Sequence, residues 1–144
     1  MVNYIPKAGN AHVPSYQISS IPYVTSSFAV PPSGTHTPVA VCFPRVTNFV
    51  TVYNSVTGST SAPLRVGFSE NGVNAAEGNH NYYVLDNGES YTGTWRVERI
   101  YLLADKSNLA CSASIIAGLT PIETGSIPGM VAGAGNWSGS IGVG

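Results

Sequence analysis

Charged residues are scarce in this chain of 144 residues. Lys and Arg total 6 and Asp and Glu total 7, so 9% of the sequence is charged, against roughly 25% in an average soluble domain. A surface with so few charges does little to keep copies of a protein apart. The composition therefore predicts that other protein covers much of this surface. The 6 basic residues are scattered and form no basic stripe of the kind that binds nucleic acid.

Cysteines and long apolar runs are also few. The 2 cysteines, Cys42 and Cys111, lie in apolar strand-like runs, whereas secreted disulfide scaffolds carry more cysteines, placed in loops. We predict two buried thiols in a protein that folds in a reducing compartment, with a Cys42–Cys111 bridge as the alternative if their strands face each other. No run of about 18 apolar residues is present, which predicts that no segment inserts into a membrane. No signal peptide is expected at the N-terminus.

Residues that commonly bind metals do not form spaced motifs. The histidines, His12, His36 and His80, are far apart and lack the spacing of zinc ligands. Glu70 and Glu77 flank an Asn-rich loop, but a calcium loop usually needs more carboxylates. The sequence therefore predicts no metal site and no cofactor.

A catalytic serine is suggested by the stretch GFSENG, which comes within one residue of the nucleophile elbow G-x-S-x-G. The glycine after Ser69 arrives one position late, at Gly72, and the following VNAAEGNHN is expected to be loop and not helix. The pattern predicts a strand that ends in a turn at Ser69. We therefore expect no catalytic residue and no enzyme activity.

Three zones with different patterning divide the chain. In residues 1–22, Pro6, Pro14 and Pro22 recur at equal intervals beside apolar residues, which predicts an extended N-terminal arm that lies on another surface. Residues 23–118 are rich in strand-forming residues and predict one domain. Residues 119–144 carry a glycine every few positions and predict a Gly-rich C-terminal tail that becomes ordered only against a partner.

The middle zone contains eight short segments rich in Val, Ile, Thr, Tyr and Phe, separated by turn-forming residues. The segments are 23–30, 39–43, 45–55, 64–69, 81–85, 90–95, 97–104 and 109–119. Asp86-Asn87-Gly88 is a strong signal for a tight hairpin turn, and no segment has helical spacing. We predict an all-β fold, namely a single eight-stranded jelly-roll sandwich, with an eight-stranded barrel as the alternative.

Two clusters of side chains are candidates for contacts with other molecules. The first consists of three charged residues around Val97: Arg96, Glu98 and Arg99. They predict either a cross-strand charge pair or an ion pair at a subunit interface. The second consists of four aromatic residues on two neighbouring strands: Tyr82, Tyr83, Tyr91 and Trp95. They predict either part of the sandwich core or a platform on which a glycan stacks.

The block from residue 48 to 104 resembles a known family. Its features are a strand that ends in V-x-N-S, the stretch LRVGFSENGV at 64–73, an Asn-Tyr-Tyr strand at 81–83, a strand that begins at Ser90, and Arg96 followed by Ile100-Tyr101. This pattern is similar to that of the small single-jelly-roll penton (vertex) capsid proteins of large icosahedral double-stranded DNA viruses. The similarity covers about two fifths of the chain.

The resemblance implies a structural capsid protein, a homopentamer that closes the fivefold vertices of an icosahedral virion assembled in the host cell cytoplasm. Its implied partners are its own copies and the major and minor capsid proteins of the shell. No nucleic acid is expected among the partners. Two alternatives stay open: a viral spike, fibre or lectin-like glycan-binding module, and a minor cement protein between capsomers.

Overall fold

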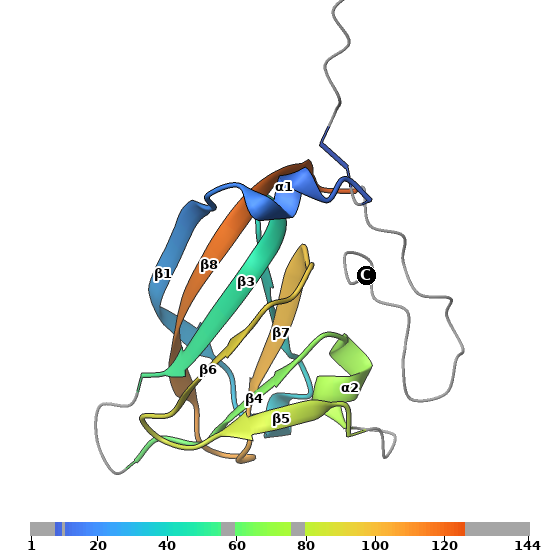
Figure 1. Ribbon diagram of the computed structural model, residues 1–144. Helices are drawn as coiled ribbons and strands as arrows, with labels where there is room; N and C mark the ends of the chain where they lie inside the picture. The colour runs from blue at the N-terminus through green and yellow to red at the C-terminus, as the bar shows by residue number, and fades with distance from the viewer. Residues whose placement is uncertain (1–7, 10, 56–59, 76–79, 126–144) are drawn as a thin grey trace, which may run out of the picture.

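The computed structural model describes residues 8–9, 11–55, 60–75 and 80–125. In this part of the chain, eight β-strands form two antiparallel four-stranded sheets that pack face to face (Figure 1). Sheet A has the strand order β1-β8-β3-β6, and sheet B has the order β2-β7-β4-β5. The prediction of an all-β fold with eight strands is confirmed.

Each of the eight predicted segments overlaps one strand, and β1 and β8 extend beyond their predicted bounds. The strands are β1 (Ile21–Val30), β2 (Val39–Cys42), β3 (Arg45–Asn54), β4 (Leu64–Gly67), β5 (Tyr82–Leu85), β6 (Ser90–Gly93), β7 (Arg99–Ala104) and β8 (Cys111–Glu123). The helical elements are α1 (Pro14–Gln17), the 3-10 turn η1 (Ser33–Thr35) and α2 (Glu70–Asn74). None of these short helical elements was predicted, because a single turn of helix leaves no periodic pattern in a sequence.

The strand pairs are nested around the connection between β4 and β5. Strand β4 pairs with β5, β3 with β6, β2 with β7 and β1 with β8, all antiparallel. Two further pairs, β3 with β8 and β4 with β7, join these ribbons into the two sheets. Because the nested partners are distant in sequence, the topology brings both ends of the domain together in sheet A.

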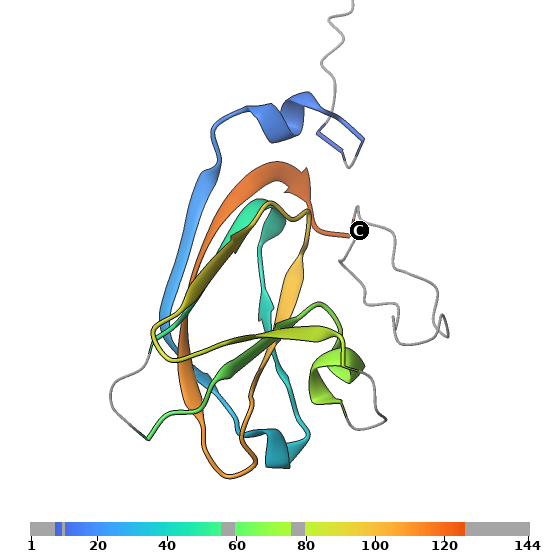
Figure 2. The ribbon, with the colours of Figure 1, turned by 60° about the horizontal axis from the view of Figure 1, so that its bottom comes forward.

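The hydrophobic core lies between the two sheets and is built from alternate residues of the strands, as the period of two in a strand requires. Its largest members without exposed surface are Val30, Val50, Val52, Leu64, Val66, Ile100, Leu102 and Ile115. A second, smaller cluster is formed by Val46 and Ile122 at the end of the sandwich where α1 lies. Figure 2 shows α1 lying across this end.

Aromatic pairs close both open sides of the sandwich. Beside β1 and β2, the rings of Tyr23 and Phe43 meet edge to face with their centroids 5.3 Å apart. Beside β5 and β6, a larger cluster is centred on Trp95 and includes Phe68 at 4.8 Å. Aromatic rings suit these positions because one ring can span much of the ~10 Å gap between two sheets.

The prediction of an extended arm over residues 1–22 is wrong for residues 14–17 and 21–22. Residues 14–17 form α1 and residues 21–22 belong to β1. Tyr16 packs against the cluster of Val46 and Ile122, and the Asn48 side-chain amide donates a hydrogen bond to the Tyr16 carbonyl at 3.1 Å. Residues 1–7 and 10 lie outside the described residues. The described part of the arm therefore contacts its own sandwich.

The predicted boundary between the domain and the tail at residue 118 is also wrong. Strand β8 continues to Glu123, and the Thr120 hydroxyl donates to the Val46 carbonyl at 2.7 Å. Gly118 misled the prediction, because it is a packing position and not the start of a flexible tail. A Cβ atom on Gly118 would lie 2.4 Å from the Phe49 ring. Residues 126–144 of the predicted tail lie outside the described residues.

Both cysteines are free, so the alternative of a Cys42–Cys111 bridge is wrong. Cys111 is buried as predicted, but Cys42 is exposed. Cys42 follows the buried Val41 on β2 and therefore points to the opposite, outer face of sheet B.

Candidate functional site

Three of the four predicted aromatic residues form one cluster where β5 of sheet B meets β6 of sheet A. The ring centroids of Tyr91 and Trp95 are 5.8 Å apart with a 22° angle between the ring planes, so these rings stack. Tyr83 lies 5.4 Å from Tyr91 and 6.2 Å from Trp95. Tyr83 and Trp95 pack against the core between the sheets, as the core interpretation predicted, whereas Tyr91 lies at the exposed edge of the cluster.

Burial differs within this aromatic cluster. The Tyr83 hydroxyl is buried without a hydrogen-bond partner among the described residues, and burial raises the pKa of that hydroxyl far above its usual value, with the nearby Tyr91 adding to the effect. Trp95 is half-buried and lies flat on Gly93, where a Cβ atom would come within 2.0 Å of the indole ring. Only Tyr91, with 52% of its surface exposed, offers a ring face to solvent.

Tyr82 does not belong to this cluster. As the residue before Tyr83 on β5, it points to the outer face of sheet B. There the Arg65 guanidinium lies over the Tyr82 ring, 4.6 Å from its centroid. Arg65 also forms an ion pair with Asp105 and donates to the Val73 carbonyl. Tyr82 therefore takes part in the contacts that hold α2 on sheet B.

The three charged residues around Val97 have different surroundings. Glu98 is 5% exposed, and its carboxylate accepts a hydrogen bond from the backbone N–H of Gly125. Arg96 is exposed, whereas the Nε atom of Arg99 is buried without a hydrogen-bond partner among the described residues. Glu98 thus acts within its own chain, where it holds the last described turn after β8. A subunit contact through Arg96 and Arg99 stays a prediction.

Ser69 is a helix cap. Residues 70–74, which were predicted as a turn and the start of a loop, form the short helix α2, so the prediction is wrong for them. Residues 76–79 of the predicted loop lie outside the described residues. The Ser69 hydroxyl oxygen accepts a hydrogen bond from the Gly72 N–H at 3.1 Å, and Ser69 itself has extended backbone angles and is buried. The strained backbone of a nucleophile elbow is absent at Ser69. The hydroxyl therefore caps a helix and carries no sign of activation.

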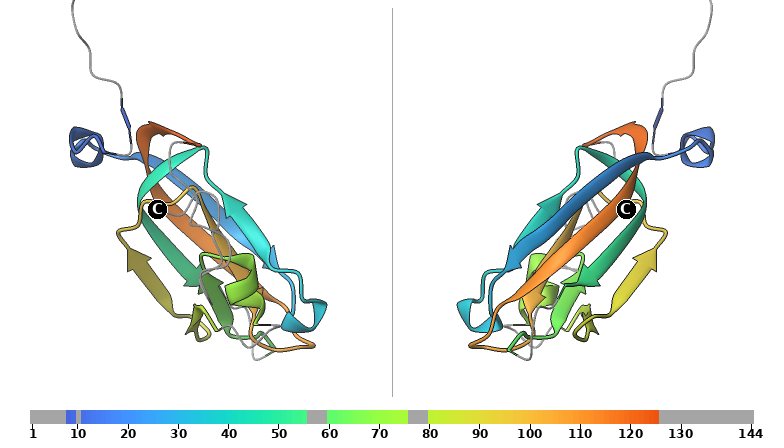
Figure 3. Two further views of the ribbon diagram at one scale, coloured as in Figure 1. Left: turned by 90° about the vertical axis from the view of Figure 1, so that its right-hand side faces the viewer. Right: turned by 90° about the vertical axis from the view of Figure 1, so that its left-hand side faces the viewer.

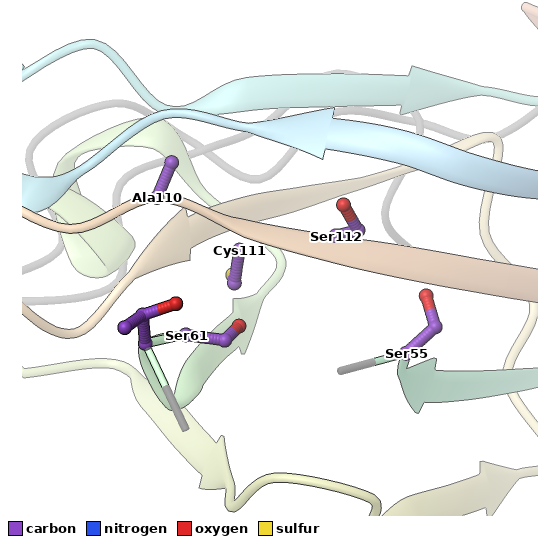
Figure 4. Close-up of a pocket in the computed structure, with 6 residues that line it drawn as sticks. Ser55, Ser61, Ala110, Cys111 and Ser112 are labelled. Atoms are coloured by element: carbon purple, nitrogen blue, oxygen red, sulfur yellow. The ribbon is translucent and has the colours of Figure 1, made fainter. Parts of the chain in front are cut away.

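A small hollow of about 220 Å³ lies between the ends of β3 and β8 (Figure 4). It is lined by Ser55, Thr60, Ser61, Ala110, Cys111 and Ser112. Burial raises the pKa of the Cys111 thiol from 9.0 to about 11, so this thiol is protonated at neutral pH. None of the described residues that line the hollow carries a base that could activate this thiol as a nucleophile.

Sheet A is nearly free of charge. Its four strands contain only two charged residues, Arg45 and Glu123, and these lie at one end with 3.7 Å between their charged atoms. The strands at the sides of sheet B, β2 and β5, contain no charged residue. The outer face of sheet A, away from its Arg45–Glu123 end, is therefore a surface that could be covered without burying a charge. The turn between β5 and β6 carries the exposed Asp86 and Glu89, so charges flank that side of the sandwich.

Large apolar side chains are exposed on several faces of the sandwich. On the side of β1 they are Ile21, Val24 and Ile116, and near α1 they are Val13 and Ile18. Tyr91 is exposed at the side of β5 and β6. Tyr53, opposite Ser90, lies on the outer face of sheet A, and Val84, opposite Arg65, lies on the outer face of sheet B. The sequence prediction missed the first group as an interaction surface, although the complete absence of charge from β1 was a usable signal.

No protein-family model matches this chain, and no curated protein matches it. Among the described residues, no group of three or more His, Cys, Asp or Glu side chains is placed to hold a metal ion. The same residues include no helix with the length and hydropathy that a bilayer crossing requires.

Proposed function

We propose that the sandwich is a jelly roll. The proposal is supported by the nested pairing of the strands, in which the first four strands pair in reverse order with the last four. Such a chain is one long antiparallel ribbon, and rolling it up gives two packed four-stranded sheets. A barrel would need hydrogen bonds between the edge strands of the two sheets, and the pairs among the described residues stop at β1 and β6 in one sheet and at β2 and β5 in the other.

We propose that the protein is a structural capsid subunit that forms the homopentameric penton at the fivefold vertices of an icosahedral virion. The observation that supports this proposal is the outer face of sheet A, whose strands carry charge only at the Arg45–Glu123 end, so that a neighbouring subunit could pack on the rest without desolvating a charge. The segment that resembles vertex proteins, residues 48–104, runs from within β3 to the end of β7 and so comprises much of the sandwich.

The test is the mass of the assembly in solution. Native mass spectrometry and sedimentation velocity of the full chain should show a closed ring of five copies. A trimer would contradict the penton and favour a fibre or spike base. A monomer at every accessible concentration would contradict the penton, the fibre and the spike base. A particle map would then separate a penton, found on the fivefold axes, from a cement protein between capsomers.

A glycan-binding module is the second candidate, because the exposed Tyr91 ring stacks on Trp95 at the β5–β6 side. Stacking of a sugar on an aromatic face is a common mode of glycan recognition. On a glycan array, binding that is lost in Tyr91→Ala and retained in Tyr53→Ala would favour this candidate. Tyr53 is the matched control because it is another exposed tyrosine, located on β3.

A further inference from the structure

The sequence contains two Asn-Gly pairs, Asn71-Gly72 and Asn87-Gly88, and the structure places them in different surroundings. An asparagine that precedes a glycine is prone to spontaneous deamidation, because glycine has no Cβ atom to hinder the approach to its own nitrogen. We propose that Asn87 is a site of deamidation in the folded protein and that helix α2 protects Asn71. The inference is independent of the proposed capsid role.

The reaction needs no reagent other than water. The backbone nitrogen of the glycine attacks the side-chain carbonyl carbon of the asparagine. A C–N bond forms, and ammonia leaves with the proton that the glycine nitrogen loses. The resulting cyclic imide adds water at one of its two carbonyl carbons and opens to aspartate or to isoaspartate, in which the main chain runs through the side-chain carbon. The asparagine side chain and the glycine nitrogen must therefore be free to rotate towards each other.

Asn87 and Gly88 lie at the exposed tip of the turn between β5 and β6. Glu89 donates its N–H to the Asp86 carbonyl at 3.0 Å, and Gly88 has a φ of 81°. This is the geometry of a type II turn, which requires a positive φ at its third residue. Among the described residues, no atom beyond the chain neighbours lies within 4 Å of the position that a Cβ atom on Gly88 would take. The turn therefore has room for the cyclic imide.

Asn71 and Gly72 lie within α2, where the same rearrangement is blocked. Gly72 is buried, and a Cβ atom on it would lie 2.5 Å from the Ser69 hydroxyl oxygen and 2.7 Å from the Cβ atom of Asn81. The Asn71 carbonyl accepts a hydrogen bond from the Ala75 N–H at 3.1 Å, which holds the residue in its helical conformation. The peptide between Asn71 and Gly72 can rotate only when this turn of helix opens.

Hydrogen bonding of the glycine nitrogen does not by itself separate the two sites. Gly72 donates its N–H to the Ser69 hydroxyl at 3.1 Å, and Gly88 donates its N–H to the Asn54 carbonyl at 3.1 Å. One such bond changes a local opening equilibrium by about tenfold at most, so Asn87 should react at no less than about a tenth of its rate in the unfolded chain. Asn71 also needs a buried helix to open, so it should react at least about tenfold more slowly than Asn87.

Deamidation would change the connection between the two sheets. Strand β5 belongs to sheet B and β6 to sheet A, and the right-hand view of Figure 3 shows β6, in yellow, at the side of sheet A opposite β1. A carboxylate at position 87 would lie between Asp86 and Glu89, where like charges repel. The isoaspartyl product also lengthens the main chain, which displaces the Gly88 N–H from the Asn54 carbonyl. We therefore expect aged protein to be less stable than fresh protein.

Peptide mapping of the full chain tests the proposal. Folded protein is incubated at physiological temperature and mildly alkaline pH, and samples are digested briefly with trypsin. Cleavage after Arg65 and Arg96 releases residues 66–96, one peptide that carries both Asn-Gly pairs. Electron-transfer fragmentation then measures aspartate and isoaspartate at both positions in the same peptide. Asn87 should be converted at least about tenfold faster than Asn71.

Two comparisons show whether the fold causes this difference. In urea both pairs should react at similar rates, because the unfolded chain no longer distinguishes their surroundings. Ser69→Ala removes the hydroxyl that caps α2, so it should accelerate the reaction of Asn71 in the folded protein and leave that of Asn87 unchanged. Equal rates for the two pairs in the folded protein, or no reaction of Asn87 where the urea-unfolded chain reacts, would overturn the proposal. An unchanged Asn71 rate in Ser69→Ala would contradict protection by the helix.

Matched variants test the effect on stability. Wild-type protein that is aged until most of its Asn87 has reacted should unfold at a lower urea concentration than fresh protein, whereas equally aged Asn87→Gln should not. Asn87→Asp carries the new charge without the isoaspartyl linkage, so its urea midpoint separates these two effects. An equal fall of the midpoint in aged Asn87→Gln would assign the loss to another part of the chain and contradict the role of this turn.

Discussion

The replacement of Trp95 by alanine should destabilise the protein, because this ring joins the two sheets on their β5–β6 side. Trp95 contacts Phe68, Tyr83 and Tyr91, with ring centroids 4.8, 6.2 and 5.8 Å away. Its backbone is also fixed, since the Thr47 hydroxyl donates to the Trp95 carbonyl at 2.7 Å. The substitution removes all the ring contacts and retains the backbone bond.

The expected loss follows from the burial of the ring. A fully buried aromatic side chain covers about 150–250 Å², at ~25 cal/mol per Å². Trp95 is half-buried, so its share is roughly half of that sum, about 2–3 kcal/mol. The aromatic pairs add a smaller amount, ~0.5–1.5 kcal/mol each where the geometry is favourable. We expect Trp95→Ala to lower the free energy of unfolding by about 3 kcal/mol.

Urea unfolding followed by far-ultraviolet circular dichroism measures this change. Association raises apparent stability, so both proteins should be compared at equal protein concentration. Trp95→Phe, which retains an aromatic ring beside Phe68, should lose about 1.5 kcal/mol or less. A loss below about 0.5 kcal/mol for Trp95→Ala would refute the structural role of the ring. Trp95 would then be free to serve as the glycan platform.

Three further predictions test burial and polar contacts. Cys42 should react with a thiol reagent in the folded protein and Cys111 only after denaturation, so two reactive native thiols would contradict the structure. Stability should fall as the pH rises from 9.0 to about 11, because the Cys111 thiol of the unfolded chain ionises in this range while the buried thiol stays protonated. In melting curves recorded across this pH range, Cys111→Ala should weaken the pH dependence. An unchanged slope of stability against pH in this variant would contradict the burial of the thiol. Arg65→Ala removes the ion pair with Asp105 and a bond to a carbonyl of α2, and Asn54→Ala removes two bonds to buried carbonyls. Each should cost about 1–3 kcal/mol in urea unfolding, and an unchanged midpoint would count against the corresponding contacts.

The strands were predictable from sequence because their side chains alternate and turn residues separate them. A turn does form at Asp86-Asn87-Gly88, where Glu89 donates its N–H to the Asp86 carbonyl and Gly88 has a φ of 81°. The hairpin predicted there is wrong, because the flanking strands β5 and β6 belong to different sheets. The short helices were not predictable, since α1 and α2 are stabilised by tertiary contacts and have no repeating pattern. Gly118 was misread for the same reason, because the Phe49 ring that requires a glycine there comes from another strand.

The candidate surfaces were predictable only in part. Low charge in the sequence predicted a covered surface, but not which face would be covered. Tyr82 and Tyr83 were grouped because they are neighbours in sequence, yet adjacent strand residues point to opposite faces. The row of Val24, Ile116 and Thr51 across sheet A could not be read from the sequence, because its members come from three strands whose register is set by pairing.

The amino-acid sequence alone determined the all-β class, the number of strands and the shortage of charge, because alternation, turn residues and composition are local properties of the chain. The tertiary structure decided which strands became edges, which aromatic rings joined the sheets and where apolar side chains stayed exposed. These features depend on contacts between residues far apart in sequence, such as the pairing of β1 with β8 at the two ends of the domain. Pairing at that distance is set by the packing of the whole sandwich.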